Sequence, residues 1–123
     1  MPRILIADDE KAISDIFSRF LGLKGHQIII AQDGQEAVSR LNTDNFDILI
    51  IDLKMPKIRG IDILKQIKER KKDIAVIILT GTLDAEEFSE LAEMGYSPKD
   101  ILYKPVDLFE FLSLVENKLL KHI

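Results

Sequence analysis

The sequence of 123 residues has no cysteine and no tryptophan, and only six glycines and four prolines. Without cysteine there can be no disulfide bond and no thiolate metal site, which fits a reducing compartment. No apolar run approaches the roughly 20 residues that a membrane-spanning helix needs. The N-terminus reaches the acidic pair Asp8-Asp9 too soon for a signal peptide. We therefore expect a cytoplasmic protein without membrane insertion.

An excess of positive charge is also missing, because 17 lysines and arginines face 21 aspartates and glutamates, for a net charge of −4. A broad basic surface for direct nucleic-acid binding is therefore not expected. The composition, 46% hydrophobic and 31% charged, is typical of a globular domain. The length suits one domain, so we expect a single domain over residues 1–123 with no second domain after it.

Five short apolar runs divide the chain, and we expect each to form a strand. The runs lie at residues 4–7, 28–30, 48–51, 74–79 and 101–103. Helical patterns follow each of them, and Asp-x-x-Glu at 33–36, 84–87 and 107–110 predicts capping boxes. Strands joined through helices run parallel. With right-handed crossovers, the sequence predicts a doubly wound α/β fold, a three-layer sandwich around a five-stranded parallel sheet, with its strand order left open.

Apolar residues at helical spacing predict which faces of the first and last helices are buried. In the first helix Ile13, Ile16, Phe17, Phe20 and Leu21 form one stripe. In the last helix the inner stripe is Leu108, Leu112, Val115 and Leu119, while Phe109, Phe111 and Leu114 lie partly off it. These three residues fit either wider packing or a partner or dimer surface.

Polar residues stand at the ends of four expected strands, namely Asp8-Asp9, Asp52, Thr80 and Lys104. In a parallel sheet these ends share one edge, where sites form in open α/β folds. Crowded carboxylates raise one another's pKa unless a cation intervenes, and their oxygens suit Mg²⁺. With a hydroxyl and an ammonium beside them, they would cradle a phosphoryl group on one carboxylate. Asp52 is the expected nucleophile because it follows the run that looks most like a buried, central strand.

Each of these residues also has an ordinary structural interpretation. A strand-end aspartate is more often a helix N-cap, a lone threonine is more often a turn residue, and a lone lysine is usually a surface residue. The functional interpretation depends on the four features occurring together in one chain of alternating strands and helices.

In this combination the sequence resembles a response-regulator receiver domain of two-component signalling, of the single-domain kind found in chemotaxis. The matching motifs are Asp8-Asp9, Asp52 followed by Met55-Pro56 and Gly60, Thr80, and Lys104-Pro105. The resemblance covers essentially the whole chain. It implies a flavodoxin-like sheet with strand order 2-1-3-4-5.

The resemblance also implies a function for this edge of the sheet. Asp52 would accept a phosphoryl group from a histidine kinase or phosphotransfer protein. Asp9, Asp52 and the backbone carbonyl of Lys54 would bind Mg²⁺ directly, and Asp8 through water. Thr80 and Lys104 would contact the phosphoryl oxygens. An output protein would bind the surface of the fourth helix, the strand at 101–103 and the last helix, where a homodimer is also possible.

Three positions depart from the family pattern. Ile101 stands where the family usually has an aromatic residue that rotates as a readout, and Tyr103 directly precedes Lys104. Arg59 precedes Gly60, and the segment 95–100 looks longer than the usual connection. The signalling surface would comprise Gly81, Thr82, Leu83, Ile101 and Tyr103. We expect the signal to pass through Gly81–Leu83 and the helix start at 84–88, with little change at Tyr103.

Three other functions compete with a phosphoacceptor domain that is not an enzyme beyond self-phosphorylation and autodephosphorylation. A Mg²⁺-dependent phosphohydrolase with an aspartyl nucleophile usually has a second aspartate two residues on, where this chain has Lys54. A nucleotide-binding domain would need a glycine-rich or Walker motif, which the sequence lacks. A pseudo-receiver that only mediates contacts would not need the intact acidic set and Lys104.

Overall fold

The computed structural model describes residues 2–122 and contains all five expected strands. They are β1 (Arg3–Ala7), β2 (Gln27–Ala31), β3 (Ile48–Asp52), β4 (Ala75–Thr80) and β5 (Ile101–Tyr103). The helices are α1 (Lys11–Leu23), α2 (Gly34–Thr43), α3 (Gly60–Glu69), α4 (Ala85–Glu93) and α5 (Leu108–His122). A short 3₁₀ helix, η1 (Pro98–Asp100), occupies the long connection before β5. The alternation of strand and helix confirms the α/β class.

The strands form one parallel sheet in the order β2-β1-β3-β4-β5. This confirms the doubly wound topology and the order that the family resemblance implied. β3 lies in the middle, and all five of its residues are buried. The register pairs Asp52 with Leu79 and Thr80 with Tyr103. The carboxyl ends of β1, β3, β4 and β5 therefore meet at one edge.

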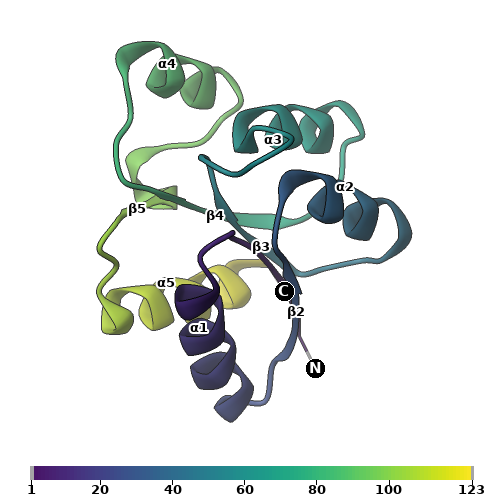
Figure 1. Cartoon of the computed structure of the whole chain (residues 1–123), viewed down its shortest axis with the longest axis vertical. Coiled ribbons are helices and arrows are strands. Elements are labelled where there is room, and N and C mark those ends of the chain that lie inside the picture. The colour runs from purple at the N-terminus through teal and green to yellow at the C-terminus, as the bar shows by residue number, and fades with distance from the viewer. Residues whose placement is uncertain (1, 123) are drawn as a thin grey trace.

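Helices cover both faces of the sheet, as Figure 1 shows. α1 and α5 lie on one face, and α2, α3 and α4 lie on the other. Because side chains alternate along a strand, β3 supplies both cores: Leu49 and Ile51 pack under α2 and α3, while Ile48 and Ile50 pack under α1 and α5. The carboxyl end of β3 is thus fixed from both sides.

The helix stripes predicted for α1 and α5 were partly wrong. Ile16 and Phe20 are exposed, whereas Phe17 and Leu21 are buried. A helix packed on a sheet buries only a limited arc of its surface. Phe17 and Leu21, four residues apart, lie within this arc, whereas Ile16 and Phe20 lie at its margin. Phe111, which lay off the predicted stripe, is fully buried and stacks on Phe17 with ring centroids 3.9 Å apart. Phe109 remains exposed.

The three predicted capping positions all work as N-caps, though with different completeness. Asp33, Asp84 and Asp107 each accept a hydrogen bond from the backbone N–H three residues on. At α4 the box is complete, because the Glu87 side chain also accepts from the Asp84 N–H. At α2 the described contacts include the hydrogen bond from the Glu36 N–H to the Asp33 side chain, but none from the Asp33 N–H to the Glu36 side chain. Within residues 2–122, no helix is long and apolar enough to cross a membrane.

Candidate functional site

The ends of four strands bring the expected polar residues to one edge of the sheet. Asp8 follows β1, Asp52 ends β3, Thr80 ends β4 and Lys104 follows β5. Asp8 is 1% exposed and Asp52 is 4% exposed, and Thr80 is fully buried. Burial of two carboxylates is costly unless charged or polar partners compensate. The partners of these two side chains therefore define the site.

Asp52 has a different donor on each of its carboxylate oxygens. Oδ1 accepts a hydrogen bond from the Lys54 backbone N–H at 2.9 Å, and Oδ2 accepts one from Lys104 Nζ at 2.8 Å. The Lys104–Pro105 peptide bond that follows is cis. Asp52 is thus held by its own loop on one side and by β5 on the other.

Lys104 is shared among three carboxylates. Its ammonium lies 2.8 Å from Asp52 Oδ2, 2.6 Å from Glu10 Oε1 and 3.2 Å from Asp8 Oδ2. Burial alone would lower the pKa of Lys104, but the hydrogen bonds to Asp52 and Glu10 and the charges of Asp8 and Asp52 raise it overall. The lysine is therefore charged at neutral pH, and it is the intervening charge that the crowded carboxylates require.

Asp8 remains the least satisfied of these acids. Burial raises the pKa of its carboxyl, the Glu10 backbone N–H and Lys104 oppose this rise, and the charge of Asp52 adds to it. Oδ1 accepts the Glu10 N–H at 2.9 Å. Oδ2 is buried and has no well-aligned hydrogen bond, although Lys104 Nζ is near. A buried carboxylate oxygen without a well-aligned donor suits a bound cation.

Asp8, Glu10 and Asp52 can offer ligand oxygens that all lie within 4.8 Å of one another. An all-carboxylate set with an unsatisfied oxygen is the chemistry of a hard divalent cation, so these residues fit Mg²⁺. Asp9 was predicted as a ligand from the sequence, whereas Glu10 was not. In the structure Asp9 is exposed and does not belong to this group. The available signal was that Glu10 is the third acid of the same run.

The hydroxyl of Thr80 points into its own loop. Thr80 Oγ1 donates to the Thr82 backbone carbonyl at 2.7 Å. This bond holds the segment Gly81–Leu83, in which Gly81 and Thr82 are exposed. On the neighbouring strand Ile101 is buried in the core under α2, α3 and α4, whereas Tyr103, paired with Thr80, is about half exposed. The predicted signalling residues thus differ in burial, from the core residue Ile101 to the exposed Gly81 and Thr82.

The loop after Asp52 packs closely against two helix starts. A Cβ atom on Gly60 would lie 2.7 Å from Leu53 Cα, and one on Gly34 would lie 2.4 Å from the Ile58 carbonyl oxygen. Gly34 N–H donates to the Pro56 carbonyl at 3.2 Å. Both glycines are therefore required by close backbone approach. The loop is fixed against α3 and α2 together.

Three basic residues of this loop have acidic partners. Lys57 has a positive φ of 75°, and its ammonium lies 3.2 Å from Asp33, the N-cap of α2. The Lys54 ammonium lies 2.7 Å from Glu87 Oε2 in the first turn of α4. Arg59, a departure from the family pattern, pairs with Asp62 on its own helix, at 3.1 Å. Only Lys54 links the loop to α4 among these pairs.

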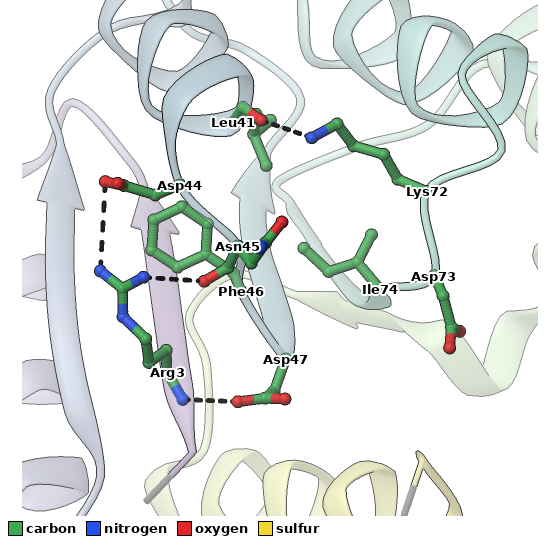
Figure 2. A pocket seen from close by; sticks show the side chains of 9 residues that line it. All are labelled: Arg3, Leu41, Asp44, Asn45, Phe46, Asp47, Lys72, Asp73 and Ile74. Carbon is green, nitrogen blue, oxygen red and sulfur yellow. Dashed lines mark hydrogen bonds and ion pairs between the residues drawn. The ribbon is translucent and has the colours of Figure 1, made fainter.

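A cavity of about 580 Å³ lies at the opposite, amino edge of the sheet. Figure 2 shows that Arg3, Asp44, Asp47 and Lys72 contact other parts of the cavity wall. Arg3 Nη1 donates to the Asn45 carbonyl at 3.0 Å and its guanidinium lies over the Phe46 ring, while Lys72 Nζ donates to the Leu41 carbonyl. Since it contains none of the strand-end residues, this cavity is not the candidate site.

Comparison with known proteins points to one family. A family model described as "Response regulator receiver domain" matches residues 4–116. The response regulator SaeR of Staphylococcus aureus is 33% identical over 119 residues, 97% of this chain and 51% of that protein. The response regulator MprA of Mycolicibacterium vanbaalenii is 31% identical over 111 residues, 90% of this chain and 47% of that protein. The chain thus spans about half the length of these relatives.

Solved structures agree with this match. The receiver domain of the Francisella response regulator 1452 superposes with a TM-score of 0.88 at 31% identity, and each chain is fully covered. A CheY-like response regulator receiver domain protein from Methanospirillum hungatei has a TM-score of 0.91 at 25% identity, covering 99% of this chain and 96% of that one.

Proposed function

The chain belongs to the family of response regulator receiver domains, and on this premise we propose that Asp52 accepts a phosphoryl group from a histidine kinase or phosphotransfer protein. The observation that carries the proposal is the buried Asp52 carboxylate, oriented by a backbone N–H and an ammonium and surrounded by two further acids. We place this single receiver domain over residues 1–123, in the cytoplasm.

The transfer forms one bond and breaks another at phosphorus. A carboxylate oxygen of Asp52 bonds to phosphorus, and the bond from phosphorus to the donor histidine nitrogen breaks. The imidazole keeps the electron pair and takes up a proton. Lys104 stays charged because its pKa is raised, so its ammonium can stabilise the negative charge on the phosphoryl oxygens.

Bound Mg²⁺ would supply positive charge to the phosphoryl oxygens. We propose that Asp52, Asp9 and the Lys54 carbonyl hold it, with Asp8 acting through water. The structure adds Glu10 as a candidate, since its carboxylate lies with those of Asp8 and Asp52. The same residues that repel one another would then gain a shared cation.

Thr80 would complete the switch. For its hydroxyl to reach a phosphoryl group on Asp52, the bond to the Thr82 carbonyl must break. This would release Gly81, Thr82 and Leu83 and alter the surface formed by α4, β5 and α5, where Phe88, Tyr103 and Phe109 are exposed. We propose that an output protein, or a second copy of the chain, binds there.

The test is intact mass after incubation with Mg²⁺ and a small phosphodonor such as acetyl phosphate. The wild-type chain should gain one phosphoryl group, and folded Asp52→Asn should gain none. An adduct that persists on Asp52→Asn would overturn the assignment. A folded wild-type chain without any adduct would instead indicate a pseudo-receiver, and rapid catalytic consumption of phosphodonor would indicate a phosphohydrolase.

A further inference from the structure

Lys54 contacts both the proposed phosphoacceptor and α4. Its backbone N–H donates to Asp52 Oδ1 at 2.9 Å, and its ammonium lies 2.7 Å from Glu87 Oε2. The two contacts belong to one residue, so a change at Asp52 reaches Lys54 without passing through Thr80 or β5. This offers a route from the site to α4 that does not depend on an aromatic residue at position 101.

Glu87 in turn is part of the structure that starts α4. Its backbone N–H donates to Asp84 Oδ1 at 2.7 Å, and its Oε1 accepts from the Asp84 N–H at 3.2 Å. The other oxygen, Oε2, is the one that Lys54 binds. A movement of the Glu87 carboxylate therefore disturbs the capping box and with it the first helical turn.

α4 depends on such contacts because its apolar anchor is small. Leu91 is its one fully buried residue. A second ion pair joins α4 to α3, with Lys65 Nζ 2.8 Å from Glu90 Oε2. Elements with few buried apolar contacts open at low free-energy cost, so ion pairs have an unusually large share in placing this helix.

We propose that Lys54 and Glu87 form a charge-operated latch that holds α4 in the resting position and opens when Asp52 is phosphorylated. The inference rests on the proposed function. A phosphoryl group brings about −1.5 to −2 charge next to the residue that carries the Lys54 ammonium. The flexible lysine side chain turns from Glu87 towards the new charge. Glu87, without its partner, releases the first turn of α4.

Two matched variants separate the latch from general loosening of α4. Glu87→Gln and Glu90→Gln each remove one carboxylate charge from α4, and the two parent side chains are similarly exposed, at 14% and 23%. Glutamine at position 87 retains an oxygen that can accept the Asp84 N–H, so the cap persists. The probe is beryllofluoride, an acyl-phosphate mimic, with saturating Mg²⁺.

Glu87→Gln should bind beryllofluoride more tightly than wild type, by about two- to fivefold, because binding no longer competes with a partly exposed ion pair. Glu90→Gln should bind like wild type. Lys54→Met should not bind beryllofluoride more tightly than wild type, because it lacks the ammonium that responds to the new charge. In the double variant, adding Glu87→Gln to Lys54→Met should not change the affinity further. If the ion pair had a purely structural role, Glu87→Gln and Lys54→Met would instead change the affinity for beryllofluoride in the same direction.

Amide chemical shifts give an independent readout. In unliganded Glu87→Gln, the amides of residues 85–88 should lie displaced towards their positions in the beryllofluoride-bound wild type. Equal effects of Glu87→Gln and Glu90→Gln, or an effect of Glu87→Gln that survives in Lys54→Met, would overturn the latch while leaving the proposed function intact. A wild-type chain that neither gains phosphoryl mass nor responds to beryllofluoride would overturn both.

Discussion

Lys104 illustrates how much a single side chain decides at this site. Asp8, Glu10 and Asp52 come from two different segments, and the lysine from a third is the cation that all three contact. Removing one partner from a buried group of charges leaves the remaining charges without compensation. The lysine therefore stabilises the folded chain as well as serving any chemistry at Asp52.

A residue outside the site gives a prediction about alkaline pH. Burial, with a smaller contribution from the charge of Asp100, raises the pKa of Tyr96 from 10.0 to about 12. A raised pKa in the folded chain stabilises the fold below the unfolded value, and this contribution is lost as pH rises through the folded value. The free energy of unfolding should therefore fall between pH 10 and 12.

Urea unfolding across this range is the measurement. Tyr96→Phe should weaken the fall, because phenylalanine cannot ionise. The control is Tyr103→Phe, which changes an exposed tyrosine and should keep the wild-type pH dependence. Identical profiles for Tyr96→Phe and wild type would contradict the assignment of this titration to Tyr96.

At this scale the residues that end strands were predictable from the sequence, but not all of their partners were. Asp52, Thr80 and Lys104 could be placed at one edge because strand ends are visible as the limits of apolar runs. The sequence could not distinguish Asp9 from Glu10 as a candidate metal ligand. Neighbouring acids in a loop differ in the direction of their side chains, which depends on the backbone conformation. The pairing of Lys54 with Glu87, 33 residues apart, had no sequence signal.

Among the elements, the loop from β3 to α3 is held by close backbone contact. Gly60→Ala would place a Cβ 2.7 Å from Leu53 Cα, so the loop or the start of α3 must shift. We expect destabilisation of roughly 1–3 kcal/mol, measured by urea unfolding. Phosphoryl gain at the adjacent Asp52 should fall as well, because the shift displaces its loop.

Gly22→Ala in α1 is the matched control. A Cβ there meets no atom within 4 Å, so alanine should stabilise the helix by about 0.5–1 kcal/mol. Equal stabilities of the two variants would show that the close approach at Gly60 is readily relieved.

Element boundaries were predictable to within a few residues, whereas the buried faces of α1 and α5 were predicted only in part. The apolar runs gave all five strands, since a buried parallel strand needs a continuous apolar segment. Phe111 and Ile16 were misassigned because the arc a helix buries depends on its rotation against the sheet, which periodicity does not fix. The strand order likewise required the family resemblance, because several orders satisfy the same right-handed crossovers.

For the whole molecule, Mg²⁺ should raise the midpoint of thermal unfolding. A ligand that binds only the folded chain stabilises it, by about 2.7 kcal/mol at a concentration 100 times its dissociation constant. Sodium chloride at the same ionic strength is the control, since general screening would act equally. Asp9→Ala should lose most of the Mg²⁺ response. A response lost in Glu10→Gln and kept in Asp9→Ala would instead favour the carboxylate group seen in the structure.

The contact between Gly34 and Ile58 has a consequence for exchanging parts among related chains. The loop from β3 to α3 and the start of α2 are packed together through Gly34 and Ile58 and through the pairing of Lys57 with Asp33. Residues 53–59 therefore cannot be exchanged between related chains on their own. A graft of this loop from another receiver would need the donor's residues 33 and 34 as well, and a library that randomises either segment alone should yield mostly misfitted combinations.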